Sequence, residues 1–199
     1  METVGSIVSP RKPGARKLQI LQTLASMLED PKGEKVTTAA LAGRLGVSEA
    51  ALYRHFASKA QMYEGLIEFI ETTVFGLINE ISAREASGLK QVRSIVGMLL
   101  EFSQTNKGMT RVLIGDALVN EHERLQERMN QLIERIESSL RQSFRVAASE
   151  KEVPDGFDAN ARAGLVVAFV IGRWHRFAKS GFRKAPGESL DAQMPTLVS

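Results

Sequence analysis

The sequence predicts an all-α protein, with an N-terminal three-helix domain that contains a helix-turn-helix and a C-terminal helical bundle that forms a homodimer. Two patterns lead to this prediction. Apolar residues recur at three- and four-residue steps along most of the chain, and residues 37–56 have the spacing of two short helices joined by a tight turn. No alternation of strands and helices is present, so we expect no parallel sheet. The 199 residues are enough to bury a sizeable core.

The composition is that of an ordinary globular protein, with 43% hydrophobic and 25% charged residues. The absence of cysteine excludes disulfides and thiolate metal sites, and it suits a cytoplasmic protein. No apolar run approaches the roughly 20 residues of a membrane span. The net charge is only +3, but basic residues outnumber acidic ones by nine to five within residues 1–60. Such a local excess is expected of a surface that faces phosphates.

Residues 1–15 are expected to form a flexible arm, because they contain several glycines and prolines and show little periodicity. From residue 16 to about residue 30, leucines recur at helical spacing. This spacing predicts an amphipathic first helix, which Pro31 and Gly33 end. The helix is the first of three in an N-terminal domain that we place at residues 16–60.

Residues 37–56 carry the helix-turn-helix pattern. Thr37 or Thr38 can cap the first helix, and Gly46 stands where a left-handed residue ends a helix without steric cost. Ser48 then stands at the N-cap of the second helix. In this motif the second helix enters the DNA major groove, although an ordinary corner between two helices shares the glycine and the apolar spacing.

Several side chains of the motif are predicted to point away from its buried face and so to be available to DNA. They are Ser48, Glu49, Ala50, Tyr53, Arg54 and His55. Ser58 caps the next helix, whose free amides, together with Lys59, could hold a phosphate. A solvated surface lysine is an equally good interpretation of Lys59.

Residues 61–199 are predicted to form a helical domain for dimerisation and regulation. Helices are expected from Ser58 past Ile81, over 89–103, over 109–117 and over 189–198, with a break at Gly88 and a turn at 105–108. A coiled-coil-like helix is expected over 118–144, because residues on one stripe follow steps of four and three for about three heptads. The stripe consists of Leu118, His122, Leu125, Met129, Leu132, Ile136 and Leu140.

The segment 158–180 is predicted to be a helix that is apolar over much of its circumference. One stripe of this helix holds the small residues Ala161, Gly164, Ala168 and Gly172. Small residues let two helices approach closely, so we expect this stripe to lie between the protomers of a two-fold dimer. The alternative is the central helix of a monomeric bundle.

Four stretches of the motif resemble the DNA-binding domain of the TetR family: 37–42 (TTAALA), 45–48 (LGVS), 51–56 (ALYRHF) and 58–59 (SK). The resemblance implies that Tyr53, His55 and Lys59 contact phosphates and that Thr38, Ser48 and Ala50 face the groove or its rim. Ala50 would contact a thymine methyl group. The candidate DNA-binding residues are therefore Thr37, Thr38, Ser48, Glu49, Ala50, Tyr53, Arg54, His55 and Lys59.

Longer stretches resemble one branch of this family, namely residues 49–56, 66–71, 110–113, 120–128 and 130–137. Members of that branch bind palindromic chromosomal sites as dimers and, when bound to DNA, inhibit assembly of the division protein FtsZ over the nucleoid. The resemblance therefore implies a nucleoid occlusion factor with double-stranded DNA, a second copy of the chain and FtsZ as partners.

The FtsZ-facing surface implied by the resemblance includes Phe69 and Asn106. Leu77, Glu101 and Thr105 depart from it, because arginine, glycine and arginine are expected at these positions. Phe69 has an equally good interpretation as a core residue.

The alternative function is that of a ligand-responsive TetR-family transcriptional repressor. Its effector pocket would be lined by residues that serve equally well as core: Leu99, Phe102, Leu113, Leu118 and Phe169. No inward polar cluster that would orient a ligand is evident. An enzyme is not expected, because His55, His122 and His175 lack metal-ligand spacing and no nucleophile or phosphate-loop motif occurs. We expect no cofactor and no metal.

Overall fold

The computed structural model describes residues 14–30 and 35–199, and every regular element within these ranges is helical. The elements are α1 (Ala15–Met27), α2 (Thr38–Leu45), α3 (Glu49–Tyr53), α4 (Lys59–Arg84), α5 (Gly88–Thr105), α6 (Lys107–Leu113), the 3-10 helix η1 (Asp116–Leu118), α7 (Glu123–Ser149), α8 (Ala159–Lys179) and α9 (Leu190–Val198). The predicted all-α fold class is confirmed.

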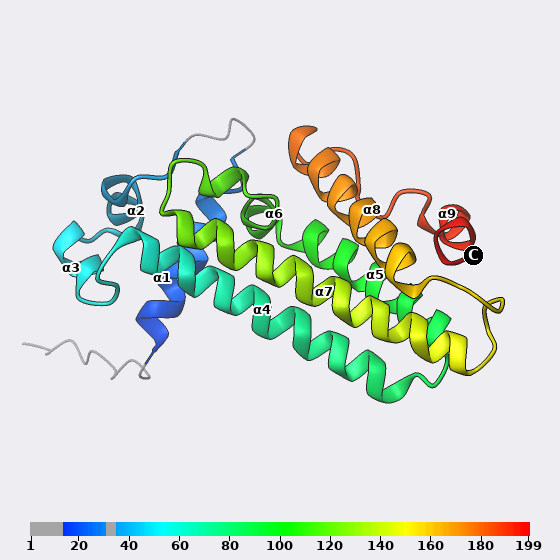
Figure 1. Ribbon diagram of the computed structural model, residues 1–199. Helices are drawn as coiled ribbons and strands as arrows, with labels where there is room; N and C mark the ends of the chain where they lie inside the picture. The colour runs from blue at the N-terminus through cyan, green and yellow to red at the C-terminus, as the bar shows by residue number, and fades with distance from the viewer. Residues whose placement is uncertain (1–13, 31–34) are drawn as a thin grey trace, which may run out of the picture.

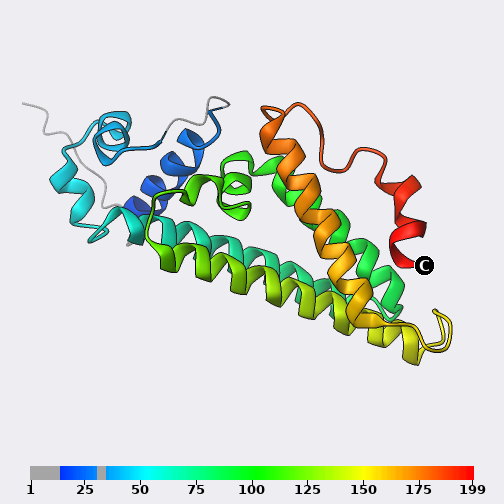
Figure 2. The same ribbon diagram turned by 45° about the horizontal axis from the view of Figure 1, so that its top comes forward.

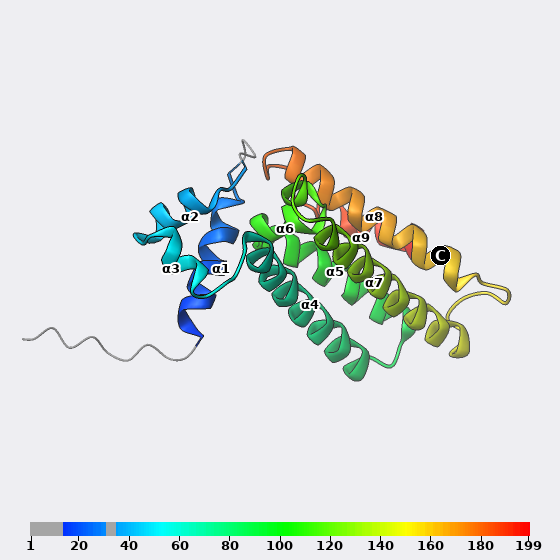
Figure 3. The same ribbon diagram turned by 60° about the vertical axis from the view of Figure 1, so that its left-hand side comes forward.

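The helices form an elongated molecule with the helix-turn-helix at one end. Figure 1 shows α1, α2 and α3 gathered at this end, while α8 and α9 lie toward the other. The two longest helices, α4 and α7, run side by side and connect the ends, as Figure 2 also shows. In Figure 3 the three N-terminal helices project beyond the layered C-terminal helices. The face of α2 and α3 that points away from the bundle is therefore open to a large partner.

One continuous hydrophobic core links the two regions. It begins among Ile20 of α1 and Leu52 of α3, continues through Ile67 of α4, and reaches Trp174 of α8. The indole Nε1 of Trp174 donates a hydrogen bond to the carbonyl oxygen of Leu99 at 3.2 Å, so the buried ring is satisfied. Because the core is continuous, the orientation of the N-terminal helices depends on their packing against the bundle.

The predicted helix caps are confirmed. The hydroxyl oxygens of Thr37, Ser48 and Ser58 each accept a hydrogen bond from the amide three residues later, at 3.1, 3.3 and 3.2 Å. Gly46 ends α2 with φ of 65°, in the left-handed region that favours glycine. Thr37 rather than Thr38 is thus the cap of α2.

The predicted coiled-coil-like helix over 118–144 is wrong at both ends. Leu118 belongs to η1, Asn120 adopts a left-handed φ of 63°, and the helix begins only after His122, whose Nδ1 accepts a bond from a backbone amide of the first turn. The apolar spacing extends back to Leu118 because this residue is buried in the preceding turn. At the other end, α7 continues to Ser149. The predicted stripe is buried at Leu125, Met129, Leu132, Ile136 and Leu140.

Two further boundaries differ from the prediction. The turn expected over 105–108 is confined to Asn106, because Lys107 already begins α6. The arm expected over 1–15 falls almost wholly outside the described residues, and Ala15 is the first residue of α1. Short polar stretches with glycine are typical of turns, but between α5 and α6 the single residue Asn106 is enough to change the direction of the chain.

Candidate nucleic-acid interface

The helix-turn-helix is a tightly packed unit. Leu41 of α2 and Leu52 of α3 are buried, and the hydroxyl of Thr38 donates a hydrogen bond to Glu49 Oε2 at 2.6 Å. This bond joins the first turns of α2 and α3, so two of the predicted DNA-binding residues are each other's partners. It orients α3 relative to α2 before any ligand is present.

The outer face of α3 is open to solvent, as predicted. The exposed members of the candidate set are Thr37, Ser48, Glu49, Ala50, Tyr53 and Arg54, while Thr38, His55 and Lys59 are half-buried. Tyr53 is 44% exposed and is one of the large hydrophobic side chains that the described part of the chain leaves open to solvent. An exposed aromatic side chain that carries a hydroxyl is suited to a polar partner such as a phosphate backbone.

Lys59 is not the freely solvated lysine that was one interpretation of the sequence. Its Nζ lies 2.5 Å from Glu121 Oε1 and 5.6 Å from the centre of the Tyr63 ring, and its side chain is 20% exposed. Lys35 reaches the same carboxylate oxygen at 3.9 Å. Burial, together with the neighbouring Glu121 carboxylate, raises the pKa of Tyr63 above its usual range. The first turn of α4 is therefore held to the segment that precedes α7.

A cluster of ion pairs in the C-terminal bundle also reaches the segment after α1 through a hydrogen bond. The guanidinium of Arg111 donates to Asp116 Oδ2 at 2.7 and 3.0 Å and to the carbonyl oxygen of Asp30 at 3.0 Å, just beyond α1. Lys179, the last residue of α8, also pairs with Asp116. Burial alone would raise the pKa of Asp116, but the hydrogen bonds from Lys179 and Arg111 lower it below its ordinary value. We call Arg111, Asp116 and Lys179 the joint cluster.

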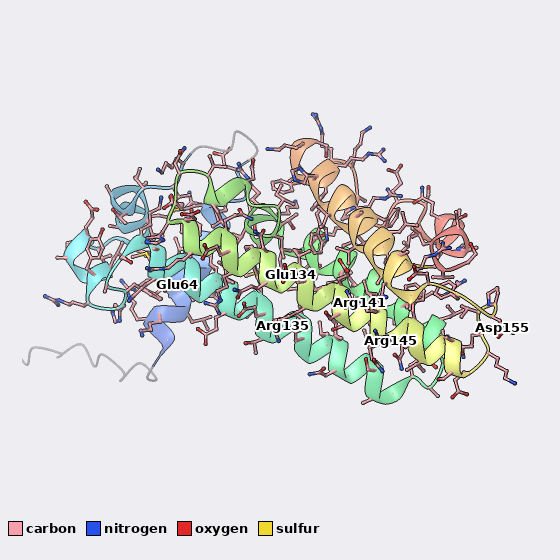
Figure 4. The ribbon with its side chains drawn as sticks, viewed as in Figure 1. Glu64, Glu134, Arg135, Arg141, Arg145 and Asp155 are labelled. Atoms are coloured by element: carbon pink, nitrogen blue, oxygen red, sulfur yellow. The ribbon has the colours of Figure 1, made fainter. Side chains whose placement is uncertain are left out.

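Arginines of α7 bind its neighbour α4. Arg124 Nε lies 2.6 Å from Glu64 Oε1, and the guanidinium of Arg135 stacks 3.8 Å above the centre of the Phe75 ring. Figure 4 shows Glu64 near the start of α7 and Arg135 further along the line where the two helices meet. These contacts hold α4 against α7, and the first turn of α4 follows directly on the helix-turn-helix.

The residues of the implied FtsZ surface lie on α4 and at the α5–α6 junction. Phe69 is 43% exposed, so its interpretation as a core residue is wrong. Asn106 is half-buried, and its side-chain Nδ2 donates to the carbonyl oxygen of Phe102 at 2.9 Å. Of the departing positions, Glu101 and Thr105 are exposed and Leu77 is half-buried.

The small-residue stripe of α8 lies on the molecular surface. Ala161, Ala168 and Gly172 are exposed, Gly164 is half-buried, and the adjoining Leu165 is 53% exposed. A Cβ atom added at Gly164 or Gly172 would meet no atom within 4 Å. The alternative of a central helix enclosed by its own bundle is therefore wrong, and no neighbour among residues 14–30 and 35–199 requires glycine at these positions.

The residues proposed to line an effector pocket are packed in the core. Leu99, Phe102, Leu113 and Leu118 are buried, and Phe169 is partly buried with the Arg173 guanidinium 5.0 Å from its ring centre. Among the residues that the structure describes, no cluster of three His, Asp or Glu side chains is placed to hold a metal ion. In the same part of the chain, no helix has the length and apolar character needed to cross a membrane.

Together, the helix-turn-helix and the helical bundle define a DNA-binding regulator of the TetR type. A family model described as "Bacterial regulatory proteins, tetR family" matches residues 33–66, and the SlmA-like model described as "Tetracyclin repressor-like, C-terminal domain" matches residues 86–199. The chain therefore belongs to the TetR family, in the group that carries the SlmA-like C-terminal domain.

Curated relatives match over most of the chain. The nucleoid occlusion factor SlmA of Idiomarina loihiensis is 47% identical over 178 residues, which cover 89% of this chain and 91% of that protein. SlmA of Vibrio cholerae is 47% identical over 181 residues, which cover 88% and 90%. AibR, solved with isovaleryl coenzyme A and operator DNA, superposes with a TM-score of 0.73 over 92% of this chain and 98% of its own. At 17% identity, this last similarity shows the fold alone.

The sequence did not predict three residues that contact the DNA-binding domain or support that contact, namely Glu121, Arg111 and Asp116. Lys59 and Glu121 are 62 positions apart, and Arg111 is 81 positions from Asp30. No local pattern connects residues at such separations. The prediction placed Glu121 inside the helix over 118–144, whereas Glu121 precedes α7, so the sequence offered no signal for its contact with Lys59.

Proposed function

We propose that this protein is a nucleoid occlusion factor: a homodimer that binds palindromic chromosomal DNA and, in that state, inhibits assembly of FtsZ. The observation that carries the proposal is the 43–47% identity to relatives of that name, over about nine-tenths of the chain. The sequence resemblance described above supplies FtsZ as the partner. The open face of α3 supports DNA as the ligand.

In the proposed complex, α3 enters the major groove. Ala50 contacts a thymine methyl group, and Ser48 and Thr38 face the groove or its rim. Tyr53, His55 and Lys59 contact phosphates. The N-terminal amides of α4 bind a phosphate as well, because the helix dipole favours negative charge at this helix end.

The homodimer places two such α3 helices on one DNA molecule. Because α3 has only five residues, a single copy offers few base contacts. Two copies related by a two-fold axis read two half-sites about one helical turn apart, which is why the proposed site is palindromic. The exposed stripe of Ala161, Gly164, Ala168 and Gly172 supports α8 as the surface where the copies meet.

The FtsZ-binding surface is proposed to lie along α4 and α5 around Phe69 and Asn106. Exposure of Phe69 supports this placement, since a free aromatic side chain can anchor a partner. Glu101 adds a negative charge, and Leu77 and Thr105 replace positive ones that the resemblance leads us to expect. We therefore expect the contact to depend on Phe69 more than on charge.

The test of the proposed function is sedimentation of FtsZ polymers formed with GTP. The DNA is first obtained by selecting duplexes of about 30 bp, long enough for two half-sites, from a random pool. We expect a palindrome to be recovered, and polymer to be lost only when both protein and palindrome are present. Unchanged polymer in both states would contradict the proposal and would favour the ligand-responsive repressor.

Tyr53→Ala is expected to weaken binding to the selected palindrome and to a mixed-sequence duplex by a similar factor. The contact is to phosphate, which carries no sequence information, and losing one such hydrogen bond costs about 1 kcal/mol, or roughly fivefold in affinity. Fluorescence anisotropy on both duplexes measures this. A loss confined to the palindrome would instead place Tyr53 against the bases.

Phe69→Ala is the matched counterpart, because the two aromatic side chains are almost equally exposed. DNA affinity is expected to stay within about twofold of the original, since surface substitutions away from a contact change the free energy by roughly 0.5 kcal/mol or less. Loss of FtsZ polymer is expected to fall strongly. Full retention of polymer loss would remove Phe69 from the proposed surface.

A further inference from the structure

The contact between Lys59 and Glu121 has a consequence for DNA binding. Lys59 is the first residue of α4, directly after the helix-turn-helix, at the helix end whose free amides are proposed to bind a phosphate. In the free protein this group points back to a carboxylate of the C-terminal bundle at 2.5 Å. A cation that is paired in this way is not free to neutralise a phosphate.

The carboxylate itself is held in a confined site. The Glu121 side chain is only 10% exposed, and among the residues that the structure describes the charged and titratable groups that face it are Lys59, Lys35 and the hydroxyl of Tyr63, whose pKa is raised. A half-buried carboxylate is costly without a cation, so Glu121 needs at least one partner at all times. Lys35, 59% exposed and 3.9 Å away, is placed to supply the second cation.

The segment that carries Glu121 is anchored at its other side. Asp116 lies five residues earlier and is bound by Arg111 of α6 and Lys179 of α8. Between these anchors and Glu121, Asn120 adopts a left-handed backbone, which sets the direction in which the following side chain leaves the turn. Glu121 is thus presented to Lys59 by the bundle, not by the DNA-binding domain.

We propose that Glu121 and a DNA phosphate compete for the ammonium group of Lys59, so that DNA binding exchanges the Lys59–Glu121 ion pair for a Lys59–phosphate ion pair. This inference rests on the proposed DNA binding. Lys35 moves onto Glu121 when Lys59 leaves, which keeps the carboxylate paired. The exchange releases the first turn of α4 from the segment before α7, so the bundle responds to whether DNA is bound.

The test is the DNA affinity of Glu121→Gln, measured by anisotropy on a mixed-sequence duplex of about 30 bp and on the selected palindrome. Glutamine keeps the shape and a carbonyl acceptor but removes the charge that retains Lys59. We expect about fivefold tighter binding to both duplexes, corresponding to about 1 kcal/mol of lost competition. A structural defect would weaken binding, so a gain of affinity cannot come from damage to the fold.

Two controls isolate the exchange. Glu64→Gln makes the same change in net charge, on a carboxylate that pairs with Arg124 and not with Lys59, and is expected to leave affinity within about twofold. In a Lys59→Met background, Glu121→Gln is expected to have no effect on affinity, because the ammonium group for which the carboxylate and the phosphate compete is then absent. A gain from Glu64→Gln equal to that from Glu121→Gln would overturn the proposal by showing a general charge effect.

The remaining outcomes are also decisive. If the unmodified protein binds the duplexes and Glu121→Gln binds them equally or more weakly, the competition is disproved while the proposed DNA binding stands. If the unmodified protein binds neither duplex, the proposed function itself fails. The two failures are therefore distinguishable in the same titration.

Discussion

Gly172→Leu is expected to convert the proposed dimer into a monomer and to abolish most of its affinity for the palindrome. The glycine lies on the exposed stripe of α8, where an added Cβ meets nothing within the protomer. In the proposed two-fold dimer, the α8 helix of the partner occupies that space. A leucine side chain there forces the two backbones apart and costs about 3 kcal/mol, which raises the dimer dissociation constant more than 100-fold.

The same substitution should leave the protomer as stable as before, or slightly more stable. Leucine is favoured over glycine in a helix interior by roughly 0.5–1 kcal/mol, and the protomer offers it open space. Light scattering gives the mass and urea denaturation gives the stability of the isolated chain. If the mass is halved while the free energy of unfolding of the monomer is not reduced, the substitution has removed the interface and left the fold intact.

Gly76→Leu is the matched control for this experiment. Gly76 is also an exposed helical glycine whose added Cβ would meet no atom within 4 Å, but it lies on α4, away from the α8 stripe. The mass of the Gly76→Leu variant by light scattering should equal that of the original protein. If Gly172→Leu keeps the mass of the original protein, the stripe is not where the copies meet, and two-fold reading of a palindrome must use another surface.

Features that depend on neighbours within about four residues could be predicted from the sequence. The capping hydroxyls of Ser48 and Ser58 and the left-handed Gly46 are of this kind, because a helix end is decided by the few groups that can reach its free amides and carbonyls. The buried stripe of α7 is another case, since its period alone defines one face.

Features that depend on where distant segments meet could not be predicted. Phe69 follows the same apolar pattern as its buried neighbours Leu66 and Ile70, so only the packing of α4 reveals that it is exposed. Lys59 has no sequence signal for Glu121, because that pair exists only once α7 lies along α4. The early start predicted for α7 has a related cause: Leu118 fits the period of the helix while being buried in a different element.

Gly108→Ala is expected to destabilise the protein strongly and to loosen the DNA-binding domain from the bundle. Gly108 is buried in α6, and an added Cβ would lie 1.9 Å from the carbonyl oxygen of Ala25 in α1 and 2.9 Å from its carbonyl carbon. The obstacle is backbone, so it cannot be relieved by a change of side-chain rotamer. Either α1 or α6 must move, at a cost of about 3 kcal/mol.

Movement of α1 would also break a hydrogen bond of the joint cluster, the one that Arg111 of α6 donates to the carbonyl oxygen of Asp30 just beyond α1. The orientation of the helix-turn-helix then becomes less defined. We expect affinity for the palindrome to fall by more than affinity for a mixed-sequence duplex, since half-site spacing matters only for the palindrome. Urea denaturation and anisotropy on the two duplexes measure both effects.

Gly97→Ala provides the matched control, because this glycine lies inside α5 and an added Cβ meets nothing within 4 Å. Alanine there should stabilise the protein by roughly 0.5–1 kcal/mol through helix propensity alone. The two substitutions add the same methyl group and differ only in what it meets. Equal stability of the two variants would mean that α1 and α6 are not in close contact in solution, and that α1 is positioned by α4 and α2 alone.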